Sequence, residues 1–468
     1  MPGKSLKIFF SGIGGSGVSA IVSFMADRGH VIVGSDRIFD MNPFHPLKRI
    51  FQARGITIVP QDGDGIDDTF DLVVFSTAVE PDQPEVLKAK AYGIPIKTRP
   101  EYLAEITSSF KTIAVSGTSG KSTASGLLAF LMVSLGLNPN FIGGGRTKQF
   151  KSSINPGNSL TGNSDYLIIE ACESDGTIVN YKPTHSIILN LALDHHTVDK
   201  TASLFETLMK NTAKKVIVNA DDKNLGKITS SNAITFSIHN PSNYRAEAIS
   251  YSSFSTDFSL SEVRSRRVES PTEHKTRFSL SLPGEYNLYN ALSCIAFLSE
   301  IGISLSAVRD VLSEFKGIDR RFDIHLNNRK GLVIDDYAHN PHKISSLMKT
   351  VNQLREHICY IFQPHGFAPT RLMKKEYIKV FTENLRDTDH LILLPIFYAG
   401  GSVSKDISSH DLADEIKAQG KSVEVVEERR DILKNLYKYQ SYIIFGARDE
   451  TLSDFAKEIA RALDLTRD

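Results

Sequence analysis

The chain has 468 residues, too many for one ordinary hydrophobic core, and at ~150 residues per domain this length predicts about three domains. Lys plus Arg number 54 and Asp plus Glu number 54, so the formal net charge is zero, which argues against a nucleic-acid-binding protein that works through bulk charge. No apolar run approaches the ~18 residues of a membrane span, and the cysteines lack the spacing of a metal site or disulfide framework. We therefore expect a cytoplasmic protein that partners neither nucleic acid nor membrane.

Residues 1–107 alternate short apolar runs with helical patterns. "LKIFFSGIGG" predicts a strand that enters a glycine turn, and "VSAIVSFMADRGH" predicts the helix that follows. "VIVGSD", "DLVVFSTAV" and "IPIKT" predict further strands with the spacing of a parallel sheet. This order indicates an α/β, Rossmann-like N-terminal domain.

A second strand, glycine turn and helix begin at "KTIAVSGTSGKSTASGLLAFLMVSLGL", which predicts a separate, P-loop ATPase-like central domain over residues 108–322. Near its end, "TRFSLSLPG" alternates polar and apolar residues and predicts antiparallel strands at the domain's edge. From 323 to 468, "KGLVIDDYAHNP", "CYIFQPHG", "HLILLPIF" and "YIIFGARD" predict the strands of a C-terminal Rossmann-like domain.

The first glycine turn, "SGIGGSGVS", has the GxGxxG spacing at Gly12, Gly14 and Gly17, and Asp36 ends a later strand. Glycines allow close backbone approach to a phosphate, and a helix N-terminus attracts it. Three interpretations stay open on these residues alone: an NAD(P) site, a site for another diphosphate such as a nucleotide sugar, or a tight structural turn.

The second glycine turn, "SGTSGKST", is two residues shorter than the usual phosphate-binding loop. Lys121 can reach the β- and γ-phosphates, Ser122 can bind magnesium, and backbone amides can cradle phosphate oxygens. Small residues could form such a run by chance, but its position between a strand and a helix favours a nucleotide site. The nucleotide-binding residues expected here are Gly117, Thr118, Ser119, Gly120, Lys121, Ser122 and Thr123.

Polar residues also follow later strands. Glu170 and Glu173 lie in "LIIEACESDGT", and His195 lies in "LNLALDHHTVD". Each alone is more often a cap, an ion pair or a structural histidine, but strand ends meet at the ligand crevice of an open α/β sheet. In the third domain, Arg321 and Asp336 could bind phosphate and ribose, or could be a solvated arginine and a strand terminator.

Together these motifs resemble the Mur ligase family, the ATP-dependent amide-bond ligases of peptidoglycan precursor synthesis. "SGTSGKST", "EACESDG", "NLALDHH", "PGEYNLYNA", "GIDRRFD", "DDYAHNP" and "FQPHGFAPTR" occur in the expected order over nearly the whole chain. "GIGGSGVSAI", "GSD", "STAVEPDQPE" and "TRPEYLAEI" are most similar to the branch that adds L-alanine to UDP-N-acetylmuramate. The branch that attaches a ready-made tripeptide to the same nucleotide sugar is the near neighbour.

The resemblance implies a reaction in which ATP phosphorylates the lactyl carboxylate of UDP-N-acetylmuramate and an amine then attacks the acyl phosphate. It implies that ATP and Mg²⁺ are the cofactors, that the first glycine turn holds a UDP-sugar rather than NAD, and that the C-terminal domain closes over ATP and binds the amine substrate. We expect a monomer or a weak homodimer that binds UDP-N-acetylmuramate and an amino acid or peptide.

The resemblance also implies roles for individual residues. Lys121, Glu170 and His195 are the expected catalytic residues, and Ser122, Glu170 and His195 the expected magnesium ligands. Asn287 and Asn290 would contact adenine, Arg321 the phosphates and Asp336 the ribose. The expected substrate-binding residues are Gly12, Gly14, Gly15, Ser16, Gly17, Asp36, Ser76, His339, His365 and Arg371.

The chain departs from the family pattern at several positions. Ser119 stands where His is usual, and Cys172 where Asp is usual. Gly366 and Pro369 stand where the alanine-adding branch carries arginines, and glycine cannot pair with a carboxylate. The acceptor is therefore expected to be L-alanine, with a peptide or another amine as the alternative. A nucleotide-binding regulatory paralogue without turnover is the alternative of another class, and a plain NAD oxidoreductase is a remoter one.

Overall fold

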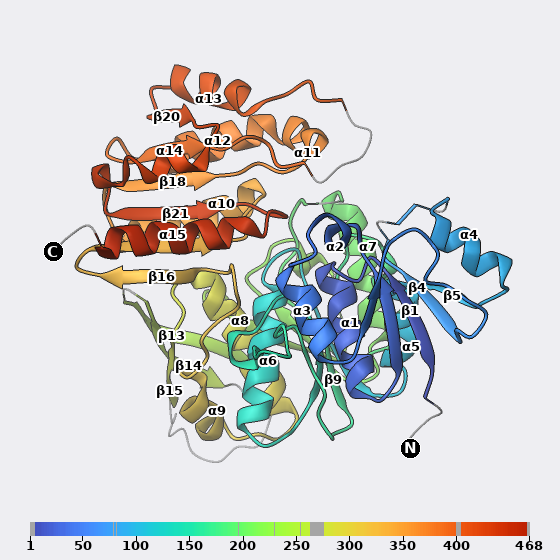
Figure 1. The fold of residues 1–468 in the computed structure, drawn as a ribbon. Coiled ribbons are helices and arrows are strands. Elements are labelled where there is room, and N and C mark those ends of the chain that lie inside the picture. Colours follow the sequence, from blue (N-terminus) through green and yellow to red (C-terminus); the bar gives the residue numbers. More distant parts are fainter. Residues whose placement is uncertain are drawn as a thin grey trace, which may run out of the picture. The chain divides into compact units, whose positions relative to one another are not determined.

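The computed structural model describes residues 5–465 except 78, 81, 195, 229, 253, 263–275 and 399–403. The chain divides into two compact units, Met1–Lys316 and Gly317–Asp468. Over the described residues the first unit contains two sheets and the second unit one (Figure 1). These sheets lie within the ranges 1–107, 108–322 and 323–468, although the division into three domains at those boundaries stays a prediction.

The first sheet is parallel, and its order is β3-β2-β1-β4-β5. Its strands are β1 (Lys7–Ser11), β2 (Val31–Ser35), β3 (Thr57–Val59), β4 (Leu72–Phe75) and β5 (Ile96–Thr98). Its helices are α1 (Ser16–Asp27), α2 (Arg37–Met41), α3 (Pro46–Ala53), α4 (Pro84–Ala91) and α5 (Arg99–Thr107). The order reverses between β1 and β4, and ligands of doubly wound sheets bind at such a switch point. The predicted Rossmann-like topology is confirmed.

The second sheet runs in the order β15-β14-β13-β12-β11-β10-β6-β9-β7-β8. Its strands are β6 (Lys111–Ser116), β7 (Asn140–Ile142), β8 (Ser159–Leu160), β9 (Tyr166–Glu170), β10 (His185–Ile188), β11 (Val216–Asn219), β12 (Ala233–Ser237), β13 (Tyr244–Tyr251), β14 (Thr256–Glu262) and β15 (Thr276–Leu280). The strands from β12 to β9 are parallel, whereas β13, β14 and β15 pair antiparallel, which confirms the predicted edge.

The helices of this part are α6 (Lys121–Ser134), α7 (Val198–Asn211), α8 (Glu285–Glu300) and α9 (Leu305–Leu312), with short 3₁₀ helices η1 (Lys148–Phe150), η2 (Thr177–Asn180) and η3 (Leu225–Lys227). Helix α6 is buried along nearly its whole length and packs against β9 and α8. A helix that is apolar on all sides is stable only in such an interior position. Its N-terminus, where the second glycine turn ends, is therefore held rigidly.

The second unit has one sheet in the order β16-β17-β21-β18-β19-β20, parallel except for the hairpin of β16 and β17. Its strands are β16 (Asp323–Asn328), β17 (Gly331–Asp336), β18 (Ile358–Phe362), β19 (His390–Leu393), β20 (Val423–Val425) and β21 (Ser441–Phe445). Its helices are α10 (Pro341–Leu354), α11 (Phe367–Leu372), α12 (Lys374–Asn384), α13 (Ser409–Ala418), α14 (Arg429–Leu433), η4 (Leu436–Lys438) and α15 (Thr451–Leu465).

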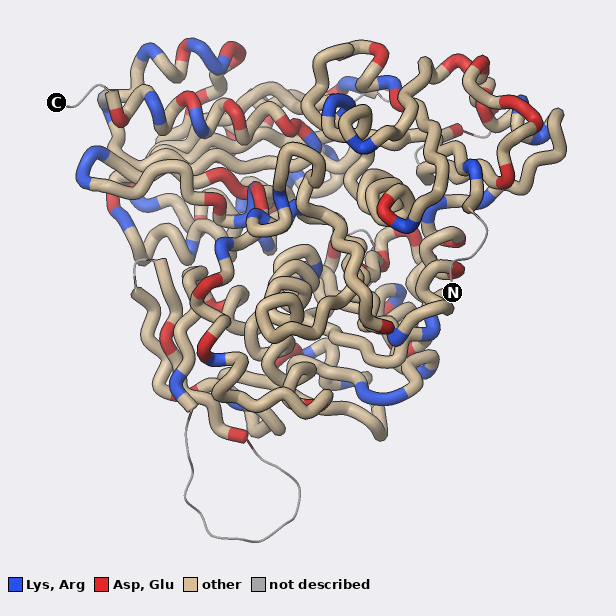
Figure 2. Tube along the Cα trace, turned by 60° about the horizontal axis from the view of Figure 1, so that its bottom comes forward, with Lys and Arg blue, Asp and Glu red and all other residues tan. Residues whose placement is uncertain are grey.

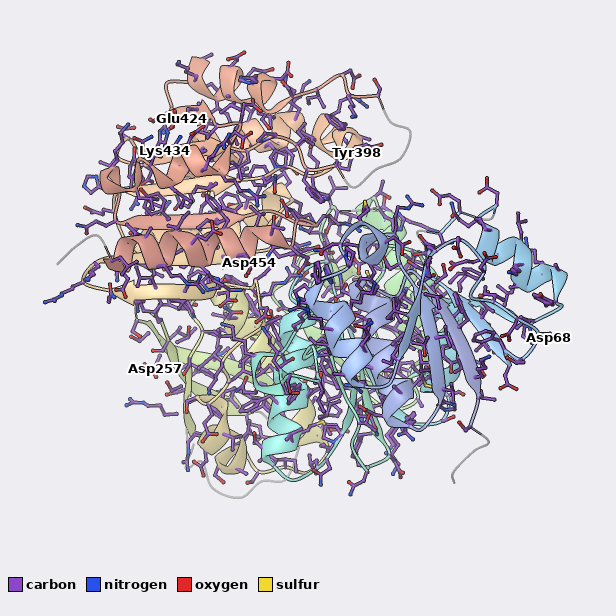
Figure 3. All side chains as sticks on the ribbon, in the orientation of Figure 1. Asp68, Asp257, Tyr398, Glu424, Lys434 and Asp454 are labelled. Carbon is purple, nitrogen blue, oxygen red and sulfur yellow. The ribbon has the colours of Figure 1, made fainter. Side chains whose placement is uncertain are left out.

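Acidic and basic residues are interspersed along the trace (Figure 2), consistent with the balanced charge of the chain. Charged side chains such as Asp68, Asp257 and Lys434 lie at the edges of their own units (Figure 3). None of the helices in the described part of the chain combines the length and the apolar character that a bilayer span requires.

Candidate active site

The first glycine loop, Gly12–Gly17, follows β1 at the switch point of the first sheet. The amides of Gly12 and Ile13 donate to the carbonyl of Ser35, at 2.9 and 3.1 Å. Gly12 has φ +79°, and a Cβ there would lie 2.7 Å from the Cβ of Ser76. Only glycine fits this conformation next to Ser76, so the ends of β1, β2 and β4 together shape the loop.

Asp36 acts on the shape of the same loop. One carboxylate oxygen accepts the amide of Gly14 at 2.7 Å, and the other caps α2 by accepting the amide of Ile38 at 3.0 Å. A carboxylate that caps a helix and holds a loop amide is fixed in place. Direct contact of Asp36 with a nucleotide sugar stays a prediction.

Two contacts tie the first glycine loop to the second sheet. The side-chain amide of Asn158 donates to the carbonyl of Ser16 at 3.0 Å. Arg99 packs beside Gly17 and forms an ion pair with Asp175 at 2.7 Å, and both partners are about one-fifth exposed. Asp175 lies in the segment that carries Glu170 and Glu173, so the two candidate sites of the first unit are physically connected.

The second glycine loop, residues 117–123, is clamped by Asn190. The side chain of Asn190 accepts the amide of Ser119 at 2.8 Å and donates to the carbonyl of Ser119 at 3.0 Å. Gly120 has φ +88° and is the N-cap residue of α6, and a Cβ there would lie 2.5 Å from the side-chain oxygen of Asn290. The loop therefore has one defined shape, with the helix N-terminus behind it.

Lys121 is held inside this loop. Its ammonium group donates to the carbonyl of Gly117 at 2.6 Å and to the carboxylate of Glu173 at 2.8 Å, and the two side chains are only 12% and 3% exposed. Burial lowers the pKa of Lys121, but the negative charges of Glu173 and Glu170 outweigh this effect, so the pKa is above its ordinary value. Lys121 is therefore charged at neutral pH and faces the loop.

Two buried polar atoms at this loop have no partner within the described ranges. They are the Ser119 hydroxyl and the side-chain nitrogen of Asn290, whose side chain lies against Gly120. Buried polar atoms normally have hydrogen-bond partners. Unpaired groups beside a cradle of loop amides fit a polyphosphate nucleotide such as ATP. The side-chain nitrogen of Asn287, in contrast, already donates to the carbonyl of Pro283 at 2.8 Å.

The expected magnesium ligands fit only an ion that completes its coordination with phosphate oxygens of the nucleotide. Glu170 accepts the amide of Gly144 at 2.9 Å, Ser122 is 7% exposed at the start of α6, and His195 lies outside the described residues. In the part of the chain that the structure describes, no three His, Cys, Asp or Glu side chains gather into a metal cluster. Mg²⁺ commonly takes one or two carboxylates and completes its shell with phosphate oxygens and water, so Ser122 and Glu170 fit such an ion.

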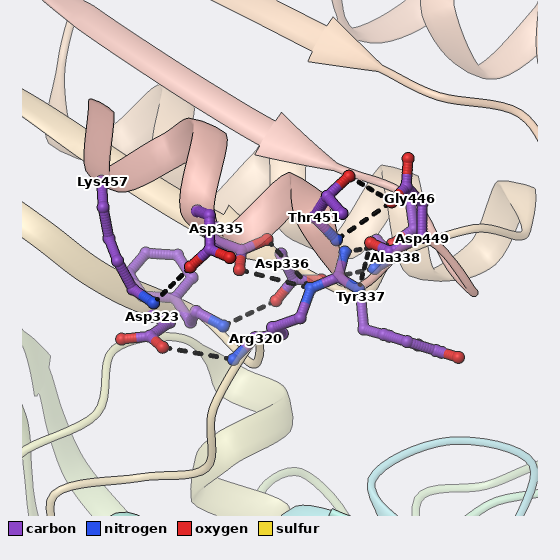
Figure 4. A network of polar contacts seen from close by, with 12 residues as sticks. Arg320, Asp323, Asp335, Asp336, Tyr337, Ala338, Gly446, Asp449, Thr451 and Lys457 are labelled. Atoms are coloured by element: carbon purple, nitrogen blue, oxygen red, sulfur yellow. Dashed lines mark hydrogen bonds and ion pairs between the residues drawn. The ribbon is translucent and has the colours of Figure 1, made fainter. Parts of the chain in front are cut away.

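In the second unit, Arg320 rather than Arg321 is the centre of a buried network (Figure 4). Arg320 is 4% exposed and donates to the carbonyls of Gly446 and Asp449 at 2.7 and 2.9 Å and to Asp335 at 3.3 Å. Burial raises the pKa of Asp335 to about 7, against the opposing charge of Arg320. The network thus joins β17 and the segment that follows β21 through one guanidinium group.

Arg321 and Asp336, the residues expected to meet phosphate and ribose, lie beside this network. The guanidinium of Arg321 lies over the ring of Tyr337, 4.7 Å from its centroid. The carboxylate of Asp336 accepts the amides of Phe322 and Ala338, both at 2.7 Å, and burial raises its pKa although Arg321 opposes this. Both oxygens of Asp336 are thus already engaged, and the two ligand roles stay predictions.

The expected acceptor residues also lie in the second unit. The rings of His339 and His365 meet edge to face, with centroids 5.1 Å apart. Arg371 forms an ion pair with Asp406 and donates to the carbonyl of Ser404 at 3.1 Å. Gly366 begins α11. The one arginine retained here therefore has its charge balanced within the protein.

Several residues that shape these sites were not expected to do so. They are Asn190, which clamps the second loop, Arg320, which organises the second unit, and Glu85, buried behind the first loop. Glu173 was expected at the ligand crevice, but its ion pair with Lys121 was not. Asn190 lies in the motif "NLALDHH" and Arg320 in "GIDRRFD", so both belong to motifs that point to the sites. No sequence pattern shows that Glu85 is buried.

Three sequence models of one family match the chain in order. They are described as "Mur ligase family, catalytic domain" over residues 7–111, "Mur ligase middle domain" over residues 115–298 and "Mur ligase, glutamate ligase domain" over residues 320–448.

Curated relatives match over nearly the full chain. The UDP-N-acetylmuramate–L-alanine ligase of Fusobacterium nucleatum is 31% identical, covering 98% of this chain and 97% of its own, and that of Sulfurihydrogenibium sp. is 30% identical, covering 97% of each. Among solved structures, the UDP-N-acetylmuramate–alanine ligase of Thermotoga maritima has a TM-score of 0.80 at 26% identity, covering 99% of this chain and 100% of its own. A murein peptide ligase of Psychrobacter arcticus shares the fold, with a TM-score of 0.70 at 22% identity and the same coverage.

Proposed function

Because the chain belongs to the Mur ligase family, we propose that it is an ATP-dependent ligase that joins L-alanine to the lactyl carboxylate of UDP-N-acetylmuramate, with ADP and phosphate as products. The observation that carries the proposal is the second glycine loop. It presents the charged, largely buried Lys121 and unpaired polar atoms at the N-terminus of a buried helix. The names of relatives matched end to end support the substrate and the amine.

The loop is suited to phosphoryl transfer onto a carboxylate. That reaction brings several negatively charged oxygens together, so catalysis depends on placing fixed positive charge and amide donors around them. Lys121 supplies the charge, and the amides of residues 117–123 supply the donors. ATP, when bound, supplies the phosphoryl group that converts the lactyl carboxylate into an acyl phosphate, the species that the amine then attacks.

Other residues hold the two substrates. Gly12–Gly17 would bind the diphosphate of the nucleotide sugar, with Ser76 beside the loop. Asn290 would bind the adenine, and Ser122, Glu170 and His195 would hold Mg²⁺, which neutralises phosphate charge when bound. We place the enzyme in the cytoplasm, as a monomer or a weak homodimer, without nucleic acid or membrane as a partner.

One observation favours a second acceptor. Gly366 and Pro369 offer no cation, and Arg371 is paired with Asp406, so the charges expected to hold the carboxylate of a free amino acid are missing or balanced. A peptide, such as the murein tripeptide, or another amine is therefore the alternative acceptor at His339 and His365.

The test is a panel of amines with ATP and UDP-N-acetylmuramate, read by mass spectrometry of the product and by phosphate release. The proposal expects ADP formation that depends on L-alanine and a product heavier by one alanine residue. Product with tripeptide but not alanine would select the alternative acceptor. ATP binding without turnover with any amine would instead indicate a regulatory paralogue.

A further inference from the structure

Glu85 is a fully buried carboxylate in the first unit. It is the second residue of α4, its exposure is 0%, and it accepts hydrogen bonds from the hydroxyls of Ser11 and Ser35. Gln61 donates to the same Ser11 hydroxyl at 3.3 Å. Glu85 therefore joins a helix to two neighbouring strands of the sheet.

Burying the carboxylate of Glu85 lowers the free energy of unfolding. Within the described residues no Lys, Arg or His forms an ion pair with Glu85, and burial raises its pKa although the two serine hydroxyls oppose this. A buried carboxyl group with only neutral partners is less favourable than a well-packed apolar side chain of similar size. Stability alone therefore does not account for Glu85.

Both serines are directly connected to the first glycine loop. Ser11 ends β1 and immediately precedes Gly12. Ser35 ends β2, and its carbonyl accepts the amides of Gly12 and Ile13. Fixing the two serine side chains fixes the strand ends from which the loop starts and to which its first amides are tied.

We propose that Glu85 is a positioning residue for the first glycine loop, which it keeps in the shape that binds the diphosphate of a nucleotide sugar. The inference rests on the proposed function, because that function supplies the ligand. Glu85 does not touch the ligand, since it lies behind the strand ends and acts through Ser11 and Ser35.

The test compares Glu85→Met, Glu85→Gln and Ser35→Ala with the full-length wild-type chain. Binding of UDP-N-acetylmuramate is measured by calorimetry, and KM is measured separately for UDP-N-acetylmuramate and ATP. Glu85→Met and Ser35→Ala are expected to weaken UDP-N-acetylmuramate binding by about tenfold, the equivalent of one lost hydrogen bond, with the KM for ATP changed by less than about twofold. Glu85→Gln is expected to bind as wild type, because its amide can satisfy both hydroxyls.

The control is Glu105→Met, a change of the same kind at a mostly exposed position on α5, which is expected to leave both KM values unchanged. Wild-type affinity in a folded Glu85→Met or Ser35→Ala protein would overturn the inference, as would an equal rise in both KM values. If Glu85→Met does not fold, Ser35→Ala decides. A wild-type chain that fails to bind UDP-N-acetylmuramate would overturn the proposed function itself, whereas unchanged binding in the variants would overturn the role of Glu85 alone.

Discussion

Replacing Lys121 by alanine should lower turnover steeply and also destabilise the protein, for two separable reasons. Lys121 supplies the fixed positive charge of the second glycine loop, so turnover should fall by roughly 10³-fold, the size of effect seen when one preorganised donor is removed. The same change leaves Glu173, which is 3% exposed, without its cation 2.8 Å away. Removing one partner of a buried ion pair costs about 3 kcal/mol in the free energy of unfolding.

The double variant Lys121→Ala/Glu173→Gln separates these effects. It contains no unpaired buried charge, so most of the lost stability should return, to within about 1 kcal/mol of wild type. Turnover should stay at the level of the single variant because the cation is still missing. Stability is measured by urea unfolding and turnover by phosphate release at saturating substrates. Near-normal turnover of Lys121→Ala would refute the catalytic role, and equal stability of wild type and Lys121→Ala would refute the importance of the ion pair.

Three further changes test other parts of the sites. Asp36→Ala should mainly weaken UDP-N-acetylmuramate binding in calorimetry, by about tenfold, and should cost about 1 kcal/mol of stability because a helix cap and the Gly14 contact are lost. Gly120→Ala should raise the KM for ATP by about tenfold or more and leave the KM for UDP-N-acetylmuramate unchanged. The added methyl group would meet Asn290, and Gly120 has a left-handed backbone conformation that alanine disfavours. Equal changes in both KM values would contradict this expectation. The pKa of Asp335 is raised to about 7, so the folded state binds a proton at this carboxyl group more tightly than the unfolded chain does. The protonated Asp335 therefore adds to the free energy of unfolding; this contribution is complete below about pH 4 and is lost as the pH rises through 7. In Asp335→Asn, the free energy of unfolding measured with urea should therefore fall less between pH 5.5 and 8 than it does in wild type. An unchanged pH dependence would contradict the raised pKa of Asp335.

The order of strands and helices around both glycine loops could be predicted from the sequence. Runs such as "TIAVS" before Gly117 are apolar on both faces of the sheet, which is typical of buried parallel strands. Glycine at 12 and 120 was also informative, because both positions have left-handed backbone conformations next to close neighbours. Local pattern and backbone conformation together determine these parts of the fold.

The partners of charged side chains could not be predicted in the same way. Glu173 meets Lys121 across 52 positions of sequence, and nothing in either segment distinguishes that pairing from a position of Glu173 in the ligand crevice. Asp36 ends a strand where contact with the nucleotide sugar is expected, but its oxygens accept hydrogen bonds from local amides. Such pairings depend on packing between distant segments, which a linear pattern does not encode.

The Arg320 network has a consequence for how this chain tolerates random substitution. Arg320 has a backbone φ of +57°, unusual for a side chain with a Cβ, and its donors reach two carbonyls and one carboxylate at once. The single ammonium group of lysine cannot replace that planar fork. In a library selected only for folded protein, position 320 should accept arginine almost alone, whereas position 321 should vary widely. A position that accepts few substitutions is thus no sign of contact with a substrate, and a neighbouring position that accepts many substitutions can be the one that contacts the substrate.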